Sequence, residues 1–173
     1  MEEQLSITSQ SLSTKPHPVD VLTIHIDGAA RGNPGPASAG VLIEHKNQSP
    51  IKEGIYLGEK TNNQAEYIAL AYALFLIKKA HKDQDMEKVK LIIYSDSQLL
   101  VRQMNGLYKV KNESLARIKK NIDIALHNIH HTIIHVAREN NKEADNLANI
   151  AIDKKNKIPT DFLKFLANCG LKG

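Results

Sequence analysis

The chain has 173 residues, 42% hydrophobic and 24% charged, with a formal net charge of +4 and an isoelectric point near 9.1. This length and composition are typical of one globular domain, and the single cysteine excludes a disulfide framework or a multi-cysteine zinc site. No apolar run reaches the length of about 18 residues that a transmembrane helix needs, so we expect a cytoplasmic protein without a membrane partner. The mildly basic charge is compatible with a nucleic-acid partner.

The composition divides the chain into three parts. Residues 1–19 are rich in Ser, Gln and Thr, and they lack the basic start and apolar run of a secretory signal. We interpret them as a flexible arm. Residues 20–154 are predicted to form the folded domain, and residues 155–173 are predicted to form a tail that could contain a short helix beginning near Pro159.

The first part of the domain has the pattern of three strands. Alternation in residues 21–26 predicts a half-buried strand that ends at Asp27, and a loop with three glycines and two prolines follows. Residues 38–45 and 51–57 predict two further strands. Because the connection between them is short, we expect an antiparallel meander.

A long helix and a fourth strand come next. Thr61 and Gln64 have the spacing of a capping box, which predicts a helix start there and places Glu66 in its first turn. Residues 89–94 predict a strand that ends beside Asp96. Because a helix intervenes, this strand can run parallel to the first one, and Asp27 and Asp96 would then be neighbours.

The second half continues the alternation of helices and strands. Residues 98–104 and 112–127 predict two helices, and residues 132–136 predict a fifth strand. Asn140 and Glu143 have capping-box spacing, which predicts the start of a helix that carries Asp145.

Four acids therefore lie near the ends of four predicted elements: Asp27, Glu66, Asp96 and Asp145. Taken singly, an acid at a helix start is most often a cap or a dipole partner. Carboxylates that converge without matching basic residues raise each other's pKa and destabilise the fold. A pair of divalent cations removes this conflict, and hard oxygen ligands favour Mg²⁺ or Mn²⁺.

Four motifs carry a resemblance to a known family, in the order that the family has them. They are residues 26–36 (IDGAARGNPGP), 61–66 (TNNQAE), 94–98 (YSDSQ) and 140–148 (NNKEADNLA). With these motifs, the chain resembles ribonuclease H type 1 over residues 19–152, nearly the whole predicted domain.

The resemblance implies an α/β fold of the ribonuclease H type, with a five-stranded mixed sheet, three strands antiparallel and then two parallel, flanked by helices. It also implies endonucleolytic hydrolysis of the RNA strand of RNA/DNA hybrids, leaving 5'-phosphate and 3'-hydroxyl ends. Two Mg²⁺ ions, or Mn²⁺, would be held by the four acids. Asp27 would bridge both ions, Asp145 would complete the ion that activates water, and Glu66 and Asp96 would hold the other.

The same resemblance implies the substrate contacts. Asn33, Asn62, Asn63 and Gln98 match positions that contact the hybrid in its minor groove, Gly32 offers close backbone approach, and Thr61 matches a DNA-phosphate contact. Amide groups and main chain can test 2'-hydroxyls without reading bases, so we expect little sequence specificity. We expect a monomer.

Two features depart from the longer members of the family. The usual histidine of the last loop has no clear equivalent, because His135 falls in the fifth strand; Arg138 is the better placed substitute, although a plain surface charge is an equal alternative. The segment 106–120 is too short for a basic protrusion and lacks tryptophan. We therefore expect a form of the family without that protrusion and without a hybrid-binding domain in front.

Two other functions compete with this interpretation. One is another nuclease on the same fold, such as an exonuclease, which the acids alone do not separate from a hybrid-cutting enzyme. The other is a noncatalytic module that binds RNA or hybrid. The full set of acids argues against the second, because charges that repel phosphate have no use in a binding module.

Overall fold

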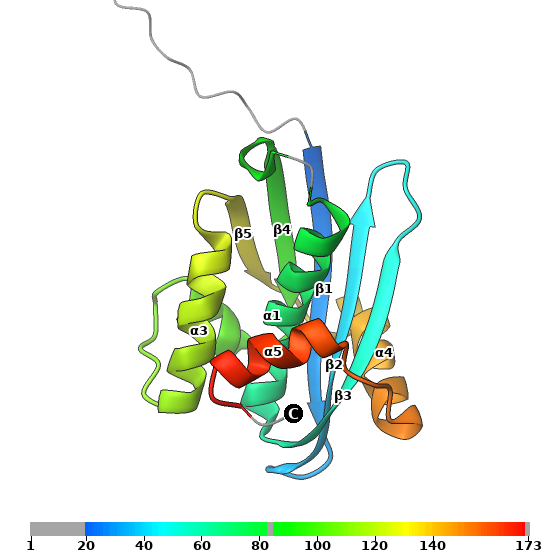
Figure 1. The fold of residues 1–173 in the computed structure, drawn as a ribbon, viewed down its shortest axis with the longest axis vertical. Helices are drawn as coiled ribbons and strands as arrows, with labels where there is room; N and C mark the ends of the chain where they lie inside the picture. Colours follow the sequence, from blue (N-terminus) through cyan, green and yellow to red (C-terminus); the bar gives the residue numbers. More distant parts are fainter. Residues whose placement is uncertain (1–19, 83–84, 172–173) are drawn as a thin grey trace, which may run out of the picture.

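A five-stranded mixed sheet forms the centre of the fold (Figure 1) in the computed structural model, which describes residues 20–82 and 85–171. The predicted arm, residues 1–19, lies outside the described residues. The strand order is β3-β2-β1-β4-β5, with antiparallel pairs on the β3 side of β1 and parallel pairs on the β5 side. The predicted fold class is therefore confirmed. The strands are β1 (Asp20–Ala30), β2 (Gly35–His45), β3 (Ile51–Lys60), β4 (Val89–Ser95) and β5 (His130–His135).

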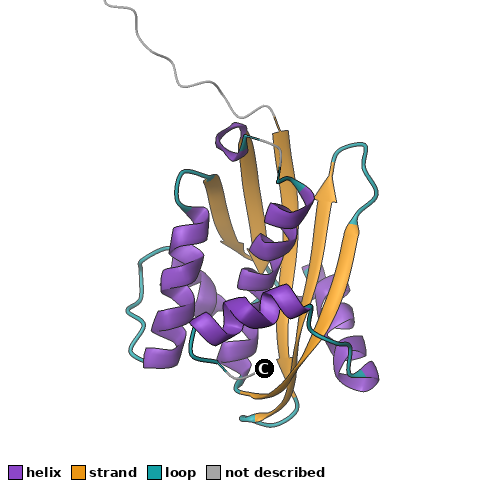
Figure 2. Ribbon diagram, in the orientation of Figure 1, coloured by secondary structure: helices purple, strands orange, loops and turns teal. Residues whose placement is uncertain are grey.

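Helices cover both faces of this sheet. In Figure 1, α1, α3 and α5 lie in front of the strands and α4 lies behind them, and Figure 2 shows the same layers by secondary structure. The α-helices are α1 (Asn62–Ala80), α2 (Gln98–Met104), α3 (Glu113–Leu126), α4 (Lys142–Lys154) and α5 (Thr160–Asn168). Two short 3₁₀ helices are η1 (Met86–Lys88) and η2 (Arg138–Asn140).

The first strand is longer than its sequence pattern predicts. β1 continues past Asp27 to Ala30, so the prediction that the strand ends at Asp27 was wrong. The small residues after Asp27 keep pairing with β2, where Gly28 opposes Ala39. On the other side of β1, Ile26 is the register partner of Ser95 in the parallel strand β4. Asp27 and Asp96 are thus neighbours, as predicted.

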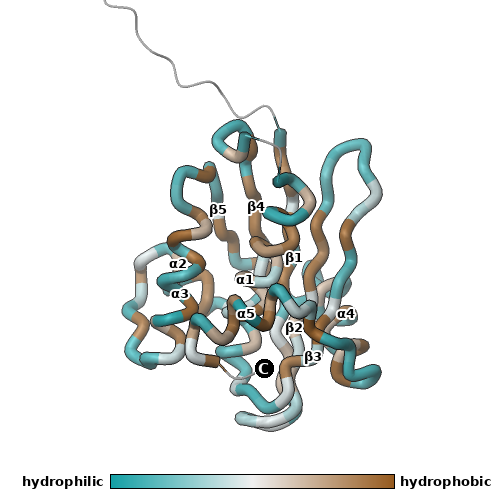
Figure 3. Tube along the Cα trace, viewed as in Figure 1, coloured by the Kyte–Doolittle hydropathy of each residue, from teal (hydrophilic) through white to brown (hydrophobic). Residues whose placement is uncertain are grey.

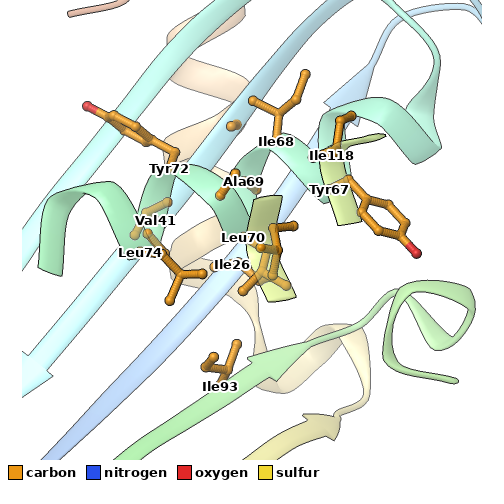
Figure 4. Close-up of a cluster of buried hydrophobic side chains, with 14 of the residues drawn as sticks. Ile26, Val41, Tyr67, Ile68, Ala69, Leu70, Tyr72, Leu74, Ile93 and Ile118 are labelled. Carbon is orange, nitrogen blue, oxygen red and sulfur yellow. The ribbon is translucent and has the colours of Figure 1, made fainter. Parts of the chain in front are cut away.

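The core lies mainly between the sheet and α1. Helix α1 is apolar on most of its circumference and is buried over most of its length. Figure 4 shows its side chains against strand residues such as Ile26, Val41 and Ile93, and Figure 3 shows hydrophobic residues concentrated in the central strands. Within residues 20–82 and 85–171, no helix is long and apolar enough to cross a membrane.

The helix starts agree with the sequence at α1 and disagree at α4. Thr61 and Gln64 form the predicted capping box at the start of α1. The predicted capping box of Asn140 and Glu143 was wrong, because Asn140 belongs to η2 and α4 begins two residues later. Glu143 instead pairs with Lys52 on β3 at 2.9 Å. Capping-box spacing occurs here without the backbone conformation that makes it a cap.

The C-terminal helix adds an aromatic cluster to the core. Phe162 is fully buried, with its ring centroid 4.9 Å from that of Tyr72 and 5.3 Å from that of Phe75, both on α1. Leu166 on the same helix is 1% exposed. Helix α5 therefore covers α1 on the side away from the sheet (Figure 1).

Candidate active site

Three of the four predicted acids meet at one place on the sheet. Asp27, Glu66 and Asp96 each offer a carboxylate oxygen, and these three atoms all lie within 4.8 Å of one another. Asp27 and Glu66 are buried and Asp96 is half-buried. They come from three elements: β1, α1 and the segment that follows β4. A set of hard oxygen donors this close suits Mg²⁺ or Mn²⁺.

A glycine lets α1 bring Glu66 to the sheet. A Cβ atom on Gly28 would lie 2.6 Å from the Cα atom of Glu66 and closer still to the neighbouring backbone, so only glycine fits there. The backbone N–H of Gly28 donates a hydrogen bond to Oε2 of Glu66 at 3.2 Å. Glu66 is the fifth residue of α1, so it belongs to the second turn and not to the first turn as predicted.

Two other glycines let α4 approach the opposite face. Gly40 on β2 is the register partner of Asp27, and a Cβ atom there would lie 2.6 Å from the backbone nitrogen of Ala148. Gly54 on β3 pairs with Gly40 and meets α4 in the same way. The hydroxyl of Ser38 donates to the carbonyl of Ala148 at 2.6 Å. Contact between the backbones of α4 and the sheet therefore sets how close α4, which carries Asp145, lies to the sheet.

Gly40→Ala should separate the stability of the fold from the geometry of the site. The added methyl group would push α4 away from β2, which we expect to cost about 1–3 kcal/mol of unfolding free energy and to lower hybrid cleavage at least about tenfold. Urea unfolding and a cleavage assay measure the two effects. Gly58→Asn is the control, because nothing lies within 4 Å of a Cβ atom there and Asn tolerates its φ of +69°. Wild-type cleavage by Gly40→Ala would contradict this account of α4.

The acids repel one another in a buried setting. The pKa of Asp27 is raised from 3.8 to about 7, first by burial and then by repulsion from Asp96 and Asp145. The pKa of Glu66 is raised well above its usual range by burial and by repulsion from Asp27 and Asp96. The positive charge of Arg138 lowers both pKa values, but by less than burial and repulsion raise them. The positive charge of Arg138 therefore does not offset the burial and mutual repulsion of the acids.

The fourth acid lies at the rim of the cluster. Asp145 is in the first turn of α4, and it is outside the trio whose oxygens lie within 4.8 Å. Its Oδ1 accepts a hydrogen bond from Nη2 of Arg138 at 2.5 Å, and its negative charge is one of the causes that raise the pKa of Asp27. The side chain of Arg138 is 75% exposed. His135 lies in β5, as predicted, and it is exposed.

Comparison with known proteins agrees with this geometry. The sequence model of a family described as reverse transcriptase-like matches residues 25–151. Ribonuclease H of Legionella pneumophila (strain Corby) is 31% identical over 148 residues, which cover 76% of this chain and 96% of that protein. Ribonuclease HI of Halobacterium salinarum is 38% identical over 131 residues, 75% of this chain and 63% of that protein's length. The chain belongs to the ribonuclease H type 1 family.

A solved structure extends the comparison to three dimensions. The crystal structure of LC11-RNase H1, in complex with an RNA/DNA hybrid, superposes with a TM-score of 0.70 at 40% identity. The match covers 77% of this chain and 97% of that ribonuclease H chain. The chain spans only 63% of the length of the Halobacterium salinarum relative, so the similarity says nothing of the rest of that protein.

The residues predicted to contact substrate lie on three segments: the loop after β1, the start of α1 and the start of α2. Asn33 and Asn62 meet directly, because Oδ1 of Asn33 accepts the backbone N–H of Asn62 at 3.1 Å. Thr61 caps α1 and is half-buried, while Gln98 is the first residue of α2 and is exposed. Gly32 lies between β1 and β2 and has a φ of +102°, a conformation that favours glycine. Gly32 and Asn63, the second residue of α1, are both exposed.

The sequence interpretation missed two contributors to the site. Isolated glycines inside strands mark close backbone approach, and this signal was present at Gly40 and Gly54. Asn141 was part of the fourth motif without a role of its own. Its side chain is 1% exposed and hydrogen-bonds to Asp96, which no spacing rule indicates.

Proposed function

We propose that this protein is an endoribonuclease that hydrolyses the RNA strand of RNA/DNA hybrids, leaving 5'-phosphate and 3'-hydroxyl ends. The observation that carries the proposal is the convergence of Asp27, Glu66 and Asp96 within 4.8 Å in a chain of the ribonuclease H family. The activity reported in the names of the relatives supports it. Cytoplasmic location and a monomeric state stay predictions from the sequence.

The donor set fits a pair of Mg²⁺ or Mn²⁺ ions. Buried carboxylates with raised pKa values gain the most from a nearby cation, because ionisation in a low-dielectric site is unfavourable without one. Asp27, Glu66, Asp96 and Asp145 would hold the ions. When bound, such ions supply the positive charge that activates a water nucleophile and stabilises the leaving oxygen of a phosphodiester.

The protein's own groups would orient the acids and bind the hybrid. The Gly28 N–H fixes one oxygen of Glu66, so that carboxylate does not need to reorganise during the reaction. Asn33 and Asn62 are joined by a hydrogen bond from the backbone N–H of Asn62 to Oδ1 of Asn33, and their exposed side chains carry amide groups that suit 2'-hydroxyl recognition. Gly32, Asn63 and Gln98 would extend this surface, and Thr61 would approach a phosphate of the DNA strand.

Arg138 is proposed to act through its charge. Its pKa is raised by the hydrogen bond and the attraction from Asp145, so the guanidinium stays protonated and does not shuttle protons. Its positive charge neutralises Asp145 when no cation is bound. When a cation binds Asp145, the exposed guanidinium would be free to pair with a phosphate oxygen of the substrate instead.

A cleavage assay with Asp145→Asn tests the proposal. Labelled RNA/DNA hybrid, RNA duplex and single-stranded RNA are incubated with the protein in Mg²⁺ or in EDTA. We expect cleavage of the hybrid alone, only with Mg²⁺, and a loss of at least about a hundredfold in kcat for Asp145→Asn. Glu143→Gln, which removes a carboxylate paired with Lys52 on the same helix, is the matched control and should keep wild-type activity.

The same assay distinguishes the alternatives. RNA placed between two DNA segments of one strand has no RNA end, so an exonuclease would leave it intact while the proposed endonuclease cuts it. A noncatalytic module would bind the hybrid and cut nothing. Equal cutting of all three substrates, or full activity of Asp145→Asn, would refute the proposal.

A further inference from the structure

The side chain of Asn141 points away from the helix that it precedes. Asn141 occupies the N-cap position of α4, where asparagine commonly accepts a hydrogen bond from the first turn, but its side chain makes no cap hydrogen bond. It is 1% exposed. A buried asparagine that gives up its usual capping role must satisfy its amide elsewhere.

Asn141 makes hydrogen bonds at or next to three of the four acids, two of them through its side-chain amide and one through its backbone carbonyl. Its Nδ2 donates to the carbonyl of Ile26 at 2.8 Å, one residue before Asp27, and to Oδ1 of Asp96 at 3.3 Å. Its own backbone carbonyl accepts the N–H of Asp145 at 3.1 Å, the first hydrogen bond of α4. One residue therefore links β1, the end of β4 and the start of α4.

His25 fixes which way this amide faces. Nδ1 of His25 lies 3.3 Å from Oδ1 of Asn141, and an amide oxygen can only accept, so this nitrogen carries the hydrogen. A flipped amide would turn its oxygen toward the Ile26 carbonyl and the Asp96 carboxylate, both acceptors. The His25 ring is held in turn by stacking on Tyr94, with centroids 4.9 Å apart.

We propose that Asn141 is a positioning residue that orients the Asp96 carboxylate and sets its spacing from Asp27 and Asp145, with His25 holding the Asn141 amide in the productive orientation. The inference rests on the proposed function, because it concerns the same acids. Groups that hydrogen-bond to metal-binding carboxylates fix the direction of their free oxygens, and their loss weakens metal affinity and activity. The hydrogen bond from Asn141 restricts rotation of the Asp96 carboxylate, so a bound ion does not have to impose that restriction itself.

A purely structural role is the competing explanation, and α4 offers a matched comparison. Asn156, just beyond the other end of α4, donates its Nδ2 to the carbonyl of Gly54 at 3.1 Å. It also ties the helix to a strand through an asparagine amide, but that hydrogen bond joins no acid. Loosening α4 at either end should lower stability, whereas only loss of Asn141 should change the acids.

The test measures Mn²⁺ binding without substrate, beside kinetics and unfolding. Isothermal titration with MnCl₂, thermal unfolding in EDTA, and kcat and KM on hybrid in Mg²⁺ are compared for wild type, Asn141→Ala, His25→Phe and Asn156→Ala. For Asn141→Ala we expect Mn²⁺ affinity and kcat each to fall about 10- to 100-fold, with KM within about twofold. His25→Phe keeps a ring to stack on Tyr94, so it should give a smaller change in the same direction. Asn156→Ala should lower the unfolding temperature and leave both Mn²⁺ affinity and kcat at wild-type values.

The outcomes separate this inference from the proposed function. Wild-type Mn²⁺ affinity in a folded Asn141→Ala variant, or equal losses in Asn156→Ala, would overturn the positioning role while leaving the nuclease assignment intact. If Asn141→Ala does not fold, His25→Phe decides: unchanged Mn²⁺ affinity and kcat overturn the inference, and a reduction of both supports it. Failure of the wild-type protein to bind Mn²⁺ or to cut hybrid would overturn the proposed function and the inference with it.

Discussion

Asp27→Asn is expected to abolish hybrid cleavage and to stabilise the metal-free protein at pH 8. The activity loss should be at least about a thousandfold, because the charge of Asp27 interacts with those of the other three acids and an amide oxygen holds a cation weakly. The gain in stability follows from the same residue, since an ionised Asp27 is buried among other carboxylates. Function and stability therefore oppose each other at this position.

The pH dependence has a definite sign. The pKa of Asp27 is about 7 in the folded protein and near its ordinary 3.8 in the unfolded chain, so the folded state holds the proton more tightly. This contribution to stability is fully present below about pH 4 and is lost as the pH rises through about 7, and a rise of this size corresponds to at most about 4 kcal/mol. Asn does not titrate, so the variant should lack this loss.

Urea unfolding in EDTA at pH 5 and pH 8 checks the prediction. Wild type should lose stability between the two pH values, Asp27→Asn should lose less, and Mg²⁺ should restore wild type at pH 8 more than the variant. Asp153→Asn, which changes an exposed carboxylate paired with Arg31, is the control and should follow wild type. A variant less stable than wild type at pH 8 in EDTA would show that burial of the charge is not what limits stability.

Phe162→Ala should lower the stability of the fold strongly without touching the acids. Its ring is fully buried against Tyr72 and Phe75, so removal leaves a cavity between α5 and α1. We expect a loss of about 3–5 kcal/mol of unfolding free energy and a fall of about 10 °C in unfolding temperature. The value of kcat at a temperature where the variant is folded should stay within about twofold, because α5 contributes none of the acids.

Leu163→Ala is the matched control for this prediction. Leu163 is on the same helix and is 37% exposed, so its truncation should cost less than about 1 kcal/mol. Helix α5 lies outside residues 25–151, the range that the family model matches. Equal stability of Phe162→Ala and wild type would mean that α5 adds nothing to the folded domain.

The order and pairing of the first four strands could be predicted from alternation and connection length, which are local signals, whereas the place of β5 followed only from the resemblance to the family. Short links between the first three strands indicated antiparallel neighbours, and the long helix before β4 indicated a parallel return. The end of β1 could not be placed, since Gly28 and the alanines after it resemble a loop in composition while they pair as a strand. Such pairing depends on β2, which a local pattern does not contain.

The acids of the site could be predicted, but not the means of holding them together. Asp27 and Asp96 follow from the parallel register, whereas Glu66 and Asp145 reach the site through helix–sheet contacts that depend on tertiary packing. The capping-box spacing of Asn140 and Glu143 led to the wrong helix start. The side chain next to it, Asn141, turned inward for reasons that lie in β1 and β4.

The glycines at positions 28, 40 and 54 have a consequence for how the sequence of this protein can diverge. They bring main chain against main chain, so the separation of the acids is set without the intervening side chains that usually change as sequences drift. Apolar residues elsewhere between α1 and the sheet, such as Ile68 and Ile93, can then be exchanged for others of similar volume with little movement of the carboxylates. Directed evolution for heat resistance should accept changes in that interior readily and reject any change at the three glycines.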